Sequence, residues 1–343
     1  MKTRTFIFVV LSLFILSIGG YSDDINFSGF FQGWFSSGQQ NSDDGNLYGF
    51  ALKRIGLKAK GNLSKNIKWF IHGGWKGQTA VIRDAYMYIS LKEEFNIKFG
   101  KFAVPGAKSG ALTSTTKLDF IERAMITQNW GYYMTLSGYR TIGVQFDGKL
   151  SNKTIYYAFM VGNNSTRRMF TPSVKSGEYS RLKTDIFISG RVEVFPVDGL
   201  STGAFYSQTK NVGSITKSDS YGFHLYYIKN DFNFKTEYLN GTAYFEFREN
   251  AKREMNYSGM LFKLGYKIDK MEPIIRYDFY TPNKDSRDFR YVKKYNNFTI
   301  GLNYLYSKNV KVQVNYVIRK ESMEGEHSEL KNNLFYVHLQ YSF

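Results

Sequence analysis

The chain has 343 residues, no cysteine, a formal net charge of +17 and 18% aromatic residues. Without cysteine, neither a disulfide framework nor a lipid-anchored cysteine is possible. A basic chain can bind nucleic acid, but an exported one meets none, so anionic lipid headgroups and small anions are the expected partners.

The first residues predict export. Lys2 and Arg4 form a basic start, an apolar run covers residues 6–18, and small residues follow at Gly19, Gly20 and Ser22. The apolar run is shorter than the roughly 20 residues that a membrane-spanning helix needs, so the pattern is typical of a secretory signal. We expect a signal peptide over residues 1–22 and one mature domain over residues 23–343.

The C-terminal strand alternates to the last residue. Its apolar positions are Phe335, Val337, Leu339, Tyr341 and Phe343, with polar or amphipathic residues between them. Alternation to the terminus suits a strand that closes a barrel, because a terminal edge would otherwise remain unpaired. A secreted β-sandwich would also alternate, but the export signal and the many aromatic residues favour a transmembrane barrel with aromatic girdles.

The remaining chain divides into short alternating runs separated by Gly, Asn, Asp and Ser. We count sixteen candidate strands and predict an all-β, transmembrane, antiparallel up-and-down barrel of about 16 strands, with both termini on the periplasmic side. A barrel of this width can hold an aqueous channel. Short connections are expected to be periplasmic turns, and four longer polar segments to be outer loops: residues 38–47, 163–183, 241–256 and 282–296.

One connection, over about residues 103–132, is too long for an unstructured surface loop. Leu118, Ile121 and Met125 recur at i, i+3 and i+7 and predict about two helical turns with one apolar face. In a wide barrel such a loop can fold inward and constrict the channel. The alternative is an external loop packed on neighbouring loops.

Several segments carry a family resemblance: Gly100-Lys-Phe-Ala-Val-Pro105, Leu112-Thr-Ser-Thr115, Leu118-Asp-Phe-Ile-Glu-Arg123, Lys53-Arg54-Ile-Gly-Leu, Arg83-Asp84-Ala-Tyr86 and Gly143-Val-Gln-Phe-Asp-Gly148. Over roughly residues 50–162, the chain resembles the phosphate-selective porins O and P of the bacterial outer membrane. The resemblance implies a homotrimer of 16-strand barrels in the outer membrane of a Gram-negative bacterium. It also implies an inward-folded constriction loop that binds oxyanions such as phosphate.

Residue by residue, the resemblance assigns a basic pair, an acidic residue, two hydroxyls and a loop arginine to the anion site: Lys53, Arg54, Asp84, Ser114, Thr115 and Arg123. The set is chemically reasonable, because guanidinium and ammonium groups supply charge and an arginine can bind an oxyanion through two donors. Hydroxyl donors replace lost hydration, and a carboxylate keeps binding weak enough for release.

The chain also departs from the family pattern. Ala111 stands where a lysine is expected, although Lys108 and Lys117 lie nearby, and Arg191 is the best remaining candidate for an arginine of the channel wall. These departures are compatible with anion selectivity that lacks a strong phosphate preference. In the alternative interpretation, the charged residues form structural salt bridges that hold the loop on the wall, and Ser114 and Thr115 cap a helix.

The sequence therefore predicts a passive outer-membrane porin that prefers anions and contacts outer-membrane lipids. The main alternative is a surface adhesin or structural barrel with an incidental pore. An enzyme is not expected, because the four histidines fall in no nucleophile or metal motif. No cofactor or metal is expected, and His72 and His338 are interpreted as wall residues.

Overall fold

The computed structural model describes residues 25–38, 47–76, 79–128, 140–163, 186–212, 215–247, 251–281, 292–323 and 332–343. The expected signal peptide, most of the expected outer loops around residues 39–46, 164–183 and 282–291, and the end of the expected constriction loop lie outside these residues. Residues 292–296, also expected in an outer loop, belong to a strand instead.

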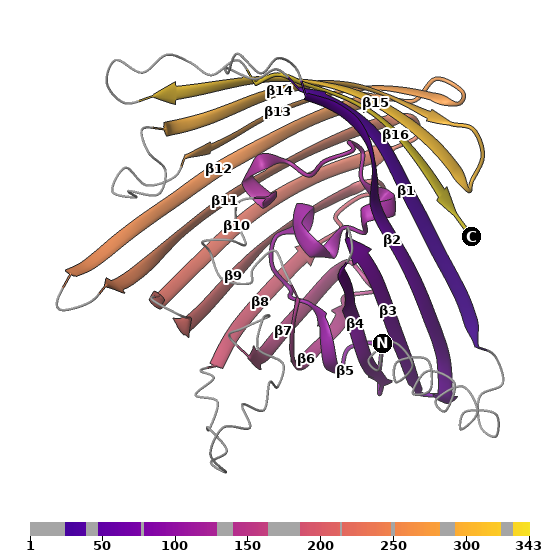
Figure 1. Cartoon of the computed structure of the whole chain (residues 1–343). Helices are drawn as coiled ribbons and strands as arrows, with labels where there is room; N and C mark the ends of the chain where they lie inside the picture. Colours follow the sequence, from indigo (N-terminus) through magenta and orange to yellow (C-terminus); the bar gives the residue numbers. More distant parts are fainter. Residues whose placement is uncertain are drawn as a thin grey trace, which may run out of the picture.

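Sixteen strands form a single closed sheet (Figure 1). The strands are β1 (Asn26–Gly38), β2 (Leu47–Ser64), β3 (Ile67–Lys76), β4 (Thr79–Ser90), β5 (Asn96–Ala103), β6 (Arg140–Leu150), β7 (Ile155–Asn163), β8 (Ile186–Val194), β9 (Leu200–Val212), β10 (Ile215–Lys229), β11 (Phe232–Phe247), β12 (Ala251–Tyr266), β13 (Met271–Thr281), β14 (Val292–Leu305), β15 (Val310–Met323) and β16 (Leu334–Ser342). Each strand pairs antiparallel with its sequence neighbours, which confirms the predicted up-and-down topology.

The last strand closes the barrel, as its uninterrupted alternation predicts. β16 pairs with β1 from Phe30–Ser342 to Gly38–Leu334. Beyond the strand, the Phe343 N–H donates to the Gly29 carbonyl at 3.0 Å, and the Gly29 N–H donates to the Phe343 carbonyl at 2.9 Å. The chain therefore ends with its final residue paired, and no edge remains at this seam.

The barrel is apolar outside and polar inside. On β16, Leu339 and Tyr341 are 48% and 47% exposed, whereas His338 and Gln340 on the opposite face are 2% and 6% exposed. This arrangement is the reverse of a soluble β-protein and presents an apolar band to lipid. Within the described residues, no helix is long and apolar enough to cross a membrane.

The expected outer loop over residues 241–256 is wrong. β11 continues to Phe247 and β12 begins at Ala251, with Gly241 opposite Tyr257 and Ala243 opposite Met255. The polar residues of this stretch belong to strands because a ladder needs only alternation and backbone pairing. Ala243 and Tyr257 are fully buried on the inner side.

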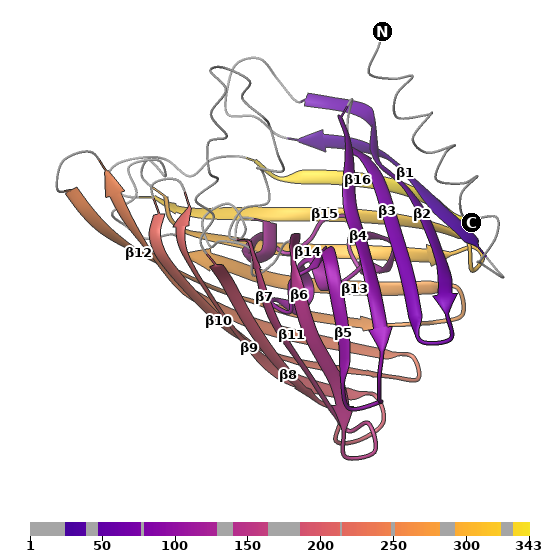
Figure 2. The ribbon, with the colours of Figure 1, turned by 90° about the horizontal axis from the view of Figure 1, so that it is seen from below.

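The connection between β5 and β6 folds into the barrel, which confirms the predicted inward constriction loop (Figures 1 and 2). We call residues 104–139 the inner loop; the structure describes it as far as Gln128. The described part contains two short helical turns, η1 (Lys108–Leu112) and η2 (Thr115–Lys117), and residues 125–128 are also helical. Its buried residues include Val104, Phe120 and Ile126.

The predicted helical turns over Leu118–Met125 are wrong, because the backbone from residue 118 to residue 124 is not helical. The barrel wall supplies the hydrogen bonds that a helix would otherwise make. The Ile121 N–H donates to Asn315 Oδ1 and the Met125 N–H to Asp278 Oδ2, both at 2.8 Å. Buried backbone groups need partners, but wall side chains can provide them as well as a helix.

Gly100, within β5, occupies a position that requires glycine. Gly100 has φ +129°, and a Cβ there would lie 2.3 Å from the Ala85 carbonyl oxygen. Both the left-handed backbone and the close approach to β4 require glycine. The glycine of the segment Gly100-Lys-Phe-Ala-Val-Pro105 is therefore required by the backbone of the strand that precedes the inner loop.

Candidate functional site

A β-bulge brings Lys53 and Arg54 to the same side of β2. Arg54 pairs with Gln32 and Leu52 with Gly33, so Lys53 is the extra residue. A bulge re-aims side chains that regular alternation would send to opposite faces. Both side chains reach Glu122 of the inner loop: Lys53 forms an ion pair with it, and Arg54 NH2 lies 3.6 Å from Glu122 Oε2.

A second bulge, on β4, adds Arg83. Asp84 pairs with His72 and Ile82 with Gly73, so Arg83 is the extra residue. Its side chain lies over Gly74 of β3, where a Cβ would come within 2.6 Å of Arg83 Nε. That Nε is buried and has no hydrogen-bond partner among the described residues. Arg83 was not among the predicted site residues, and regular alternation from Asp84 would place it on the outer face.

Asp84 is held between two wall residues. Its Oδ2 lies 2.9 Å from His72 Nδ1, and its Oδ1 accepts a hydrogen bond from Arg140 Nε at 2.8 Å. The residue is only 6% exposed. Arg140, the first residue of β6, was also not among the predicted site residues. The one sequence feature that points to it is its positive charge at the position where the chain returns from the inner loop to the barrel wall.

Arg123 braces the inner loop from within. NH1 donates to the Ser109 and Gly110 carbonyls at 2.6 Å, and NH2 donates to the Thr113 carbonyl at 2.7 Å. These bonds use three of its five N–H donors. Burial lowers the pKa of Arg123 to about 10. The group therefore remains charged at neutral pH.

The wall and loop charges converge. The charges of Arg54, Arg140 and Arg83 all act on Arg123, and after burial they are the next contributions to its lowered pKa. Lys58 of β2 lies in the same region, where the charges of Asp84, Lys117 and Arg140 act on it. We call the following set the constriction cluster: Lys53, Arg54, Arg83, Arg123, Arg140, Asp84 and Glu122. Its cations outnumber its carboxylates, so an entering anion would relieve repulsion between like charges.

The predicted hydroxyl residues lie on the loop beside this cluster. Ser114 Oγ lies 3.0 Å from Thr116 Oγ1, and Ser114 makes no side-chain bond that caps η2. The Thr115 carbonyl accepts a hydrogen bond from Gln32 Nε2 of β1 at 3.2 Å. The capping alternative therefore does not apply to Ser114, and a role of the two hydroxyls in binding anions stays a prediction.

Lys108 and Arg191 belong to a different group, at the base of the inner loop. Both form ion pairs with Glu193 of β8, and Arg191 NH1 also donates to the Gly106 carbonyl at 2.7 Å. Burial lowers the pKa of Lys108 in spite of its carboxylate partner. These two predicted residues anchor the loop on β8, whereas Lys117 is exposed on the loop.

Asp119 fastens the loop to the opposite wall. Its carboxylate lies 2.7 Å from Lys235 Nζ and 3.1 Å from Lys263 Nζ. Burial opposes ionisation, but the two lysines outweigh it and hold the pKa of Asp119 below its usual range. Asp119 was not among the predicted site residues.

The loop leaves more space on one side of the barrel than on the other. A cavity of about 60 Å³ lies between the loop and the β10–β13 wall. On the β3–β8 side, a cavity of about 390 Å³ borders Asp84, Lys98 and Thr113, and a second of about 470 Å³ lies against β1–β6. The larger cavities therefore lie along β1–β8, the part of the wall that includes the bulged strands β2 and β4.

A family model described as phosphate-selective porin O and P matches residues 25–343. The chain belongs to this family. It is an outer-membrane porin, integral to the outer membrane of a Gram-negative bacterium. No curated protein sequence matches it significantly.

Solved structures of other porins share the fold of this chain at low sequence identity. An anion-selective porin from Comamonas acidovorans has a TM-score of 0.70 and 14% identity, with 93% of this chain and 99% of that chain covered. The channel DcaP of Acinetobacter baumannii and Salmonella typhi OmpF in complex with daunomycin each have a TM-score of 0.66 and 14% identity. In both comparisons 93% of this chain and 97% of the other chain are covered. At these identities the comparison supports the fold alone.

Proposed function

We propose that this porin lets small solutes diffuse passively, with a preference for anions, and that the constriction cluster sets the preference. The supporting observation is the excess of cations over carboxylates where the inner loop meets the bulged strands. Arg83 is central to it, because this guanidinium has a buried donor without a partner among the described residues. The charge of Arg83, which also acts on Arg123 and Arg140, attracts an entering anion.

Selectivity at this point follows from short-range electrostatics. The Debye length at physiological salt is about 8 Å, so charges lining a constriction of similar width are only partly screened. Asp84 offsets part of the attraction, which favours release as well as entry. The porin then acts as a selective channel and catalyses no reaction.

Phosphate is the oxyanion suggested by the family, and the anion-selective porin of Comamonas acidovorans shares the fold. Ala111 borders the open cavity where the family pattern expects a lysine. We therefore propose a general anion preference that includes phosphate, with Lys53, Arg54, Arg83 and the Ser114 and Thr115 hydroxyls as the anion-binding groups. Arg123 adds its charge to the site while it braces the loop.

We further propose a homotrimer surrounded by outer-membrane lipid. One solved relative, OmpT of Vibrio cholerae, is described in a trimer form. On the outer face of β2, Phe50 and Tyr48 are 88% and 76% exposed, and Phe50 contacts Phe35 of β1 with ring centroids 5.1 Å apart. Such apolar surface needs lipid or a second copy to cover it. Chemical cross-linking of the porin in native membranes tests for the trimer.

Reversal potentials in planar bilayers under a potassium chloride gradient test the anion preference. The parent should give an anion-directed potential, and Arg83→Gln should reduce it. Lys229→Gln, which removes one positive charge at the last residue of β10, should leave it unchanged. Added phosphate should reduce the chloride current. A parent without anion preference, or an Arg83→Gln variant identical to it, would contradict the proposal.

A further inference from the structure

Two cavities on the open side of the barrel share one stretch of wall. The cavity of about 390 Å³ borders the constriction cluster at Asp84, and the cavity of about 470 Å³ extends to Asn26 and Lys60. Phe70, Tyr86 and Lys98 line both. A solute that leaves the constriction along this wall must therefore pass these three side chains.

The shared wall is an aromatic surface built from three neighbouring strands. Phe70 of β3 contacts Tyr86 of β4 with ring centroids 5.3 Å apart, and Tyr86 contacts Phe102 of β5 at 5.9 Å. We call these three residues the aromatic shelf. An inorganic anion is strongly hydrated and gains nothing from apolar faces, whereas a ligand with its own ring gains from ring–ring contact.

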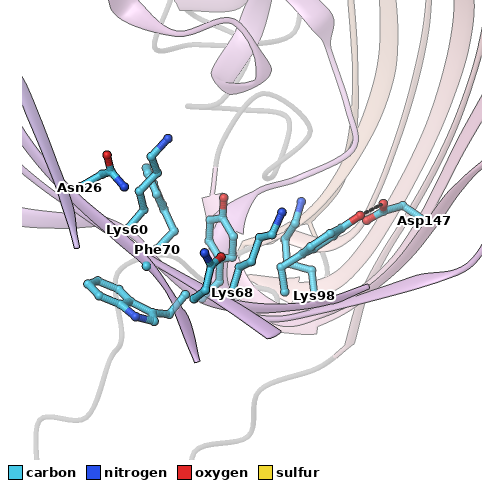
Figure 3. Close-up of a pocket in the computed structure, with 11 residues that line it drawn as sticks. Asn26, Lys60, Lys68, Phe70, Lys98 and Asp147 are labelled. Carbon is cyan, nitrogen blue, oxygen red and sulfur yellow. Dashed lines mark hydrogen bonds between the residues drawn. The ribbon is translucent and has the colours of Figure 1, made fainter. Parts of the chain in front are cut away.

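Cations surround the shelf. Lys98 Nζ lies 5.4 Å from the Tyr86 ring and 5.2 Å from the Phe102 ring. Lys60 and Lys68, on β2 and β3, have no ion-pair partner among the described residues. In Figure 3 the amino groups of Lys60, Lys68 and Lys98 all point away from the wall into the same space.

The one carboxylate of this cavity is already engaged. Asp147 accepts hydrogen bonds from Tyr88 Oη at 3.0 Å and from Gln145 Nε2 at 2.7 Å, and it is 5% exposed. Asp147 keeps its negative charge, but Lys60, Lys68 and Lys98 outnumber it, so the cavity retains an excess of positive charge. A cavity of this size also lies within the roughly 300–1,000 Å³ range of small-molecule sites.

We propose that the aromatic shelf, together with Lys60, Lys68 and Lys98, is a second binding site in the channel, specific for organic anions that carry an aromatic ring. The ring lies on Phe70 and Tyr86, and the carboxylate of the ligand faces the lysines. This inference extends the proposed anion preference, because the ligand reaches the shelf through the constriction cluster. It assigns the channel aromatic carboxylates as a preferred solute class.

Benzoate and acetate test the shelf, since they carry the same charge and differ by the ring. We expect benzoate to reduce the chloride current through the parent at about tenfold lower concentration than acetate, as a ring contact of about 1.4 kcal/mol would give. The double variant Phe70→Leu/Tyr86→Leu should abolish this difference. Lys68→Gln should weaken both anions.

Phe99→Leu is the matched control, because Phe99 lies on the same sheet but is 59% exposed on the outer face. The control should keep the preference for benzoate. If the double variant does not fold into a barrel that resists denaturation on gels, Phe70→Leu alone should still reduce the preference. Equal block by both anions in the parent, or an unchanged preference in the shelf variants, overturns the inference.

Failure of the shelf and failure of the proposed function give different results. Loss of the benzoate preference with an intact anion-directed reversal potential refutes only the shelf. A parent with no anion-directed potential refutes the constriction proposal, and the ratio of benzoate to acetate block still reports on the rings.

Discussion

Substitutions of Arg123 can distinguish two roles of this residue, bracing the inner loop and attracting anions. If its main task is to brace the inner loop, Arg123→Lys should behave much like Arg123→Gln, because a lysine keeps the charge but not the planar fork. If its main task is to attract anions, Arg123→Lys should behave like the parent. The three hydrogen bonds to loop carbonyls, at 2.6, 2.6 and 2.7 Å, favour the bracing role.

The size of the effect follows from those bonds. A hydrogen bond that involves a charged group contributes about 1.5–3 kcal/mol, so three contribute roughly 5 kcal/mol or more before the loop relaxes. Lysine can satisfy at most two of the carbonyls and should therefore lose at least one bond, about 1.5–3 kcal/mol of that amount. A loss of 3 kcal/mol changes the population of an opened loop by roughly 150-fold.

Limited proteolysis of the folded porin measures loop opening, and single-channel recording measures pore width and ion selectivity on the same preparations. We expect both Arg123 variants to be cleaved faster within residues 104–128 and to conduct more. Lys117→Gln, which removes a charge from an exposed position of the same loop, should do neither. Parent-like cleavage and conductance in Arg123→Lys, with selectivity lost only in Arg123→Gln, would refute the bracing role.

Further predictions concern the loop anchors and the basic pair. Asp119→Asn should free the loop from Lys235 and Lys263, raise the conductance and lower the denaturation temperature. The pKa of Asp119 is depressed in the fold, so the stability that its ionised form contributes should be complete above about pH 3.9. This stability should disappear only as the pH falls through the lower pKa of the folded state. Thermal unfolding between about pH 5 and 2 measures it, and a pH profile that is the same in Asp119→Asn as in the parent would contradict the prediction. The double variant Lys53→Ala/Arg54→Ala should lower the anion preference measured by reversal potential, and unchanged selectivity would remove the pair from the site. Gly100→Ala should reduce the yield of folded barrel in refolding assays, because a methyl group would approach the Ala85 carbonyl; parent-like refolding would argue against this constraint.

The strands follow from the sequence because their cause is local. A barrel wall with one face toward lipid and the other toward water requires apolar and polar residues to alternate along each strand. All sixteen strands and the closing role of residues 334–343 were therefore predictable. The inward loop was predictable for a similar reason, since its length and its apolar positions do not suit exposure to water. The polar outer ends of β11 and β12 misled the prediction, because polarity alone does not separate a loop from a strand that faces water.

The site was predictable only in part, because its geometry depends on contacts between distant residues. Two bulges place Lys53 beside Arg54 and Arg83 beside Asp84, and no local pattern marks a bulge. The same holds for the loop backbone, where wall side chains such as Asn315 replace a helix. Alternation thus determined the barrel, while the tertiary structure decided which charges meet, because pairing register and loop-to-wall hydrogen bonds join residues that lie far apart in the chain.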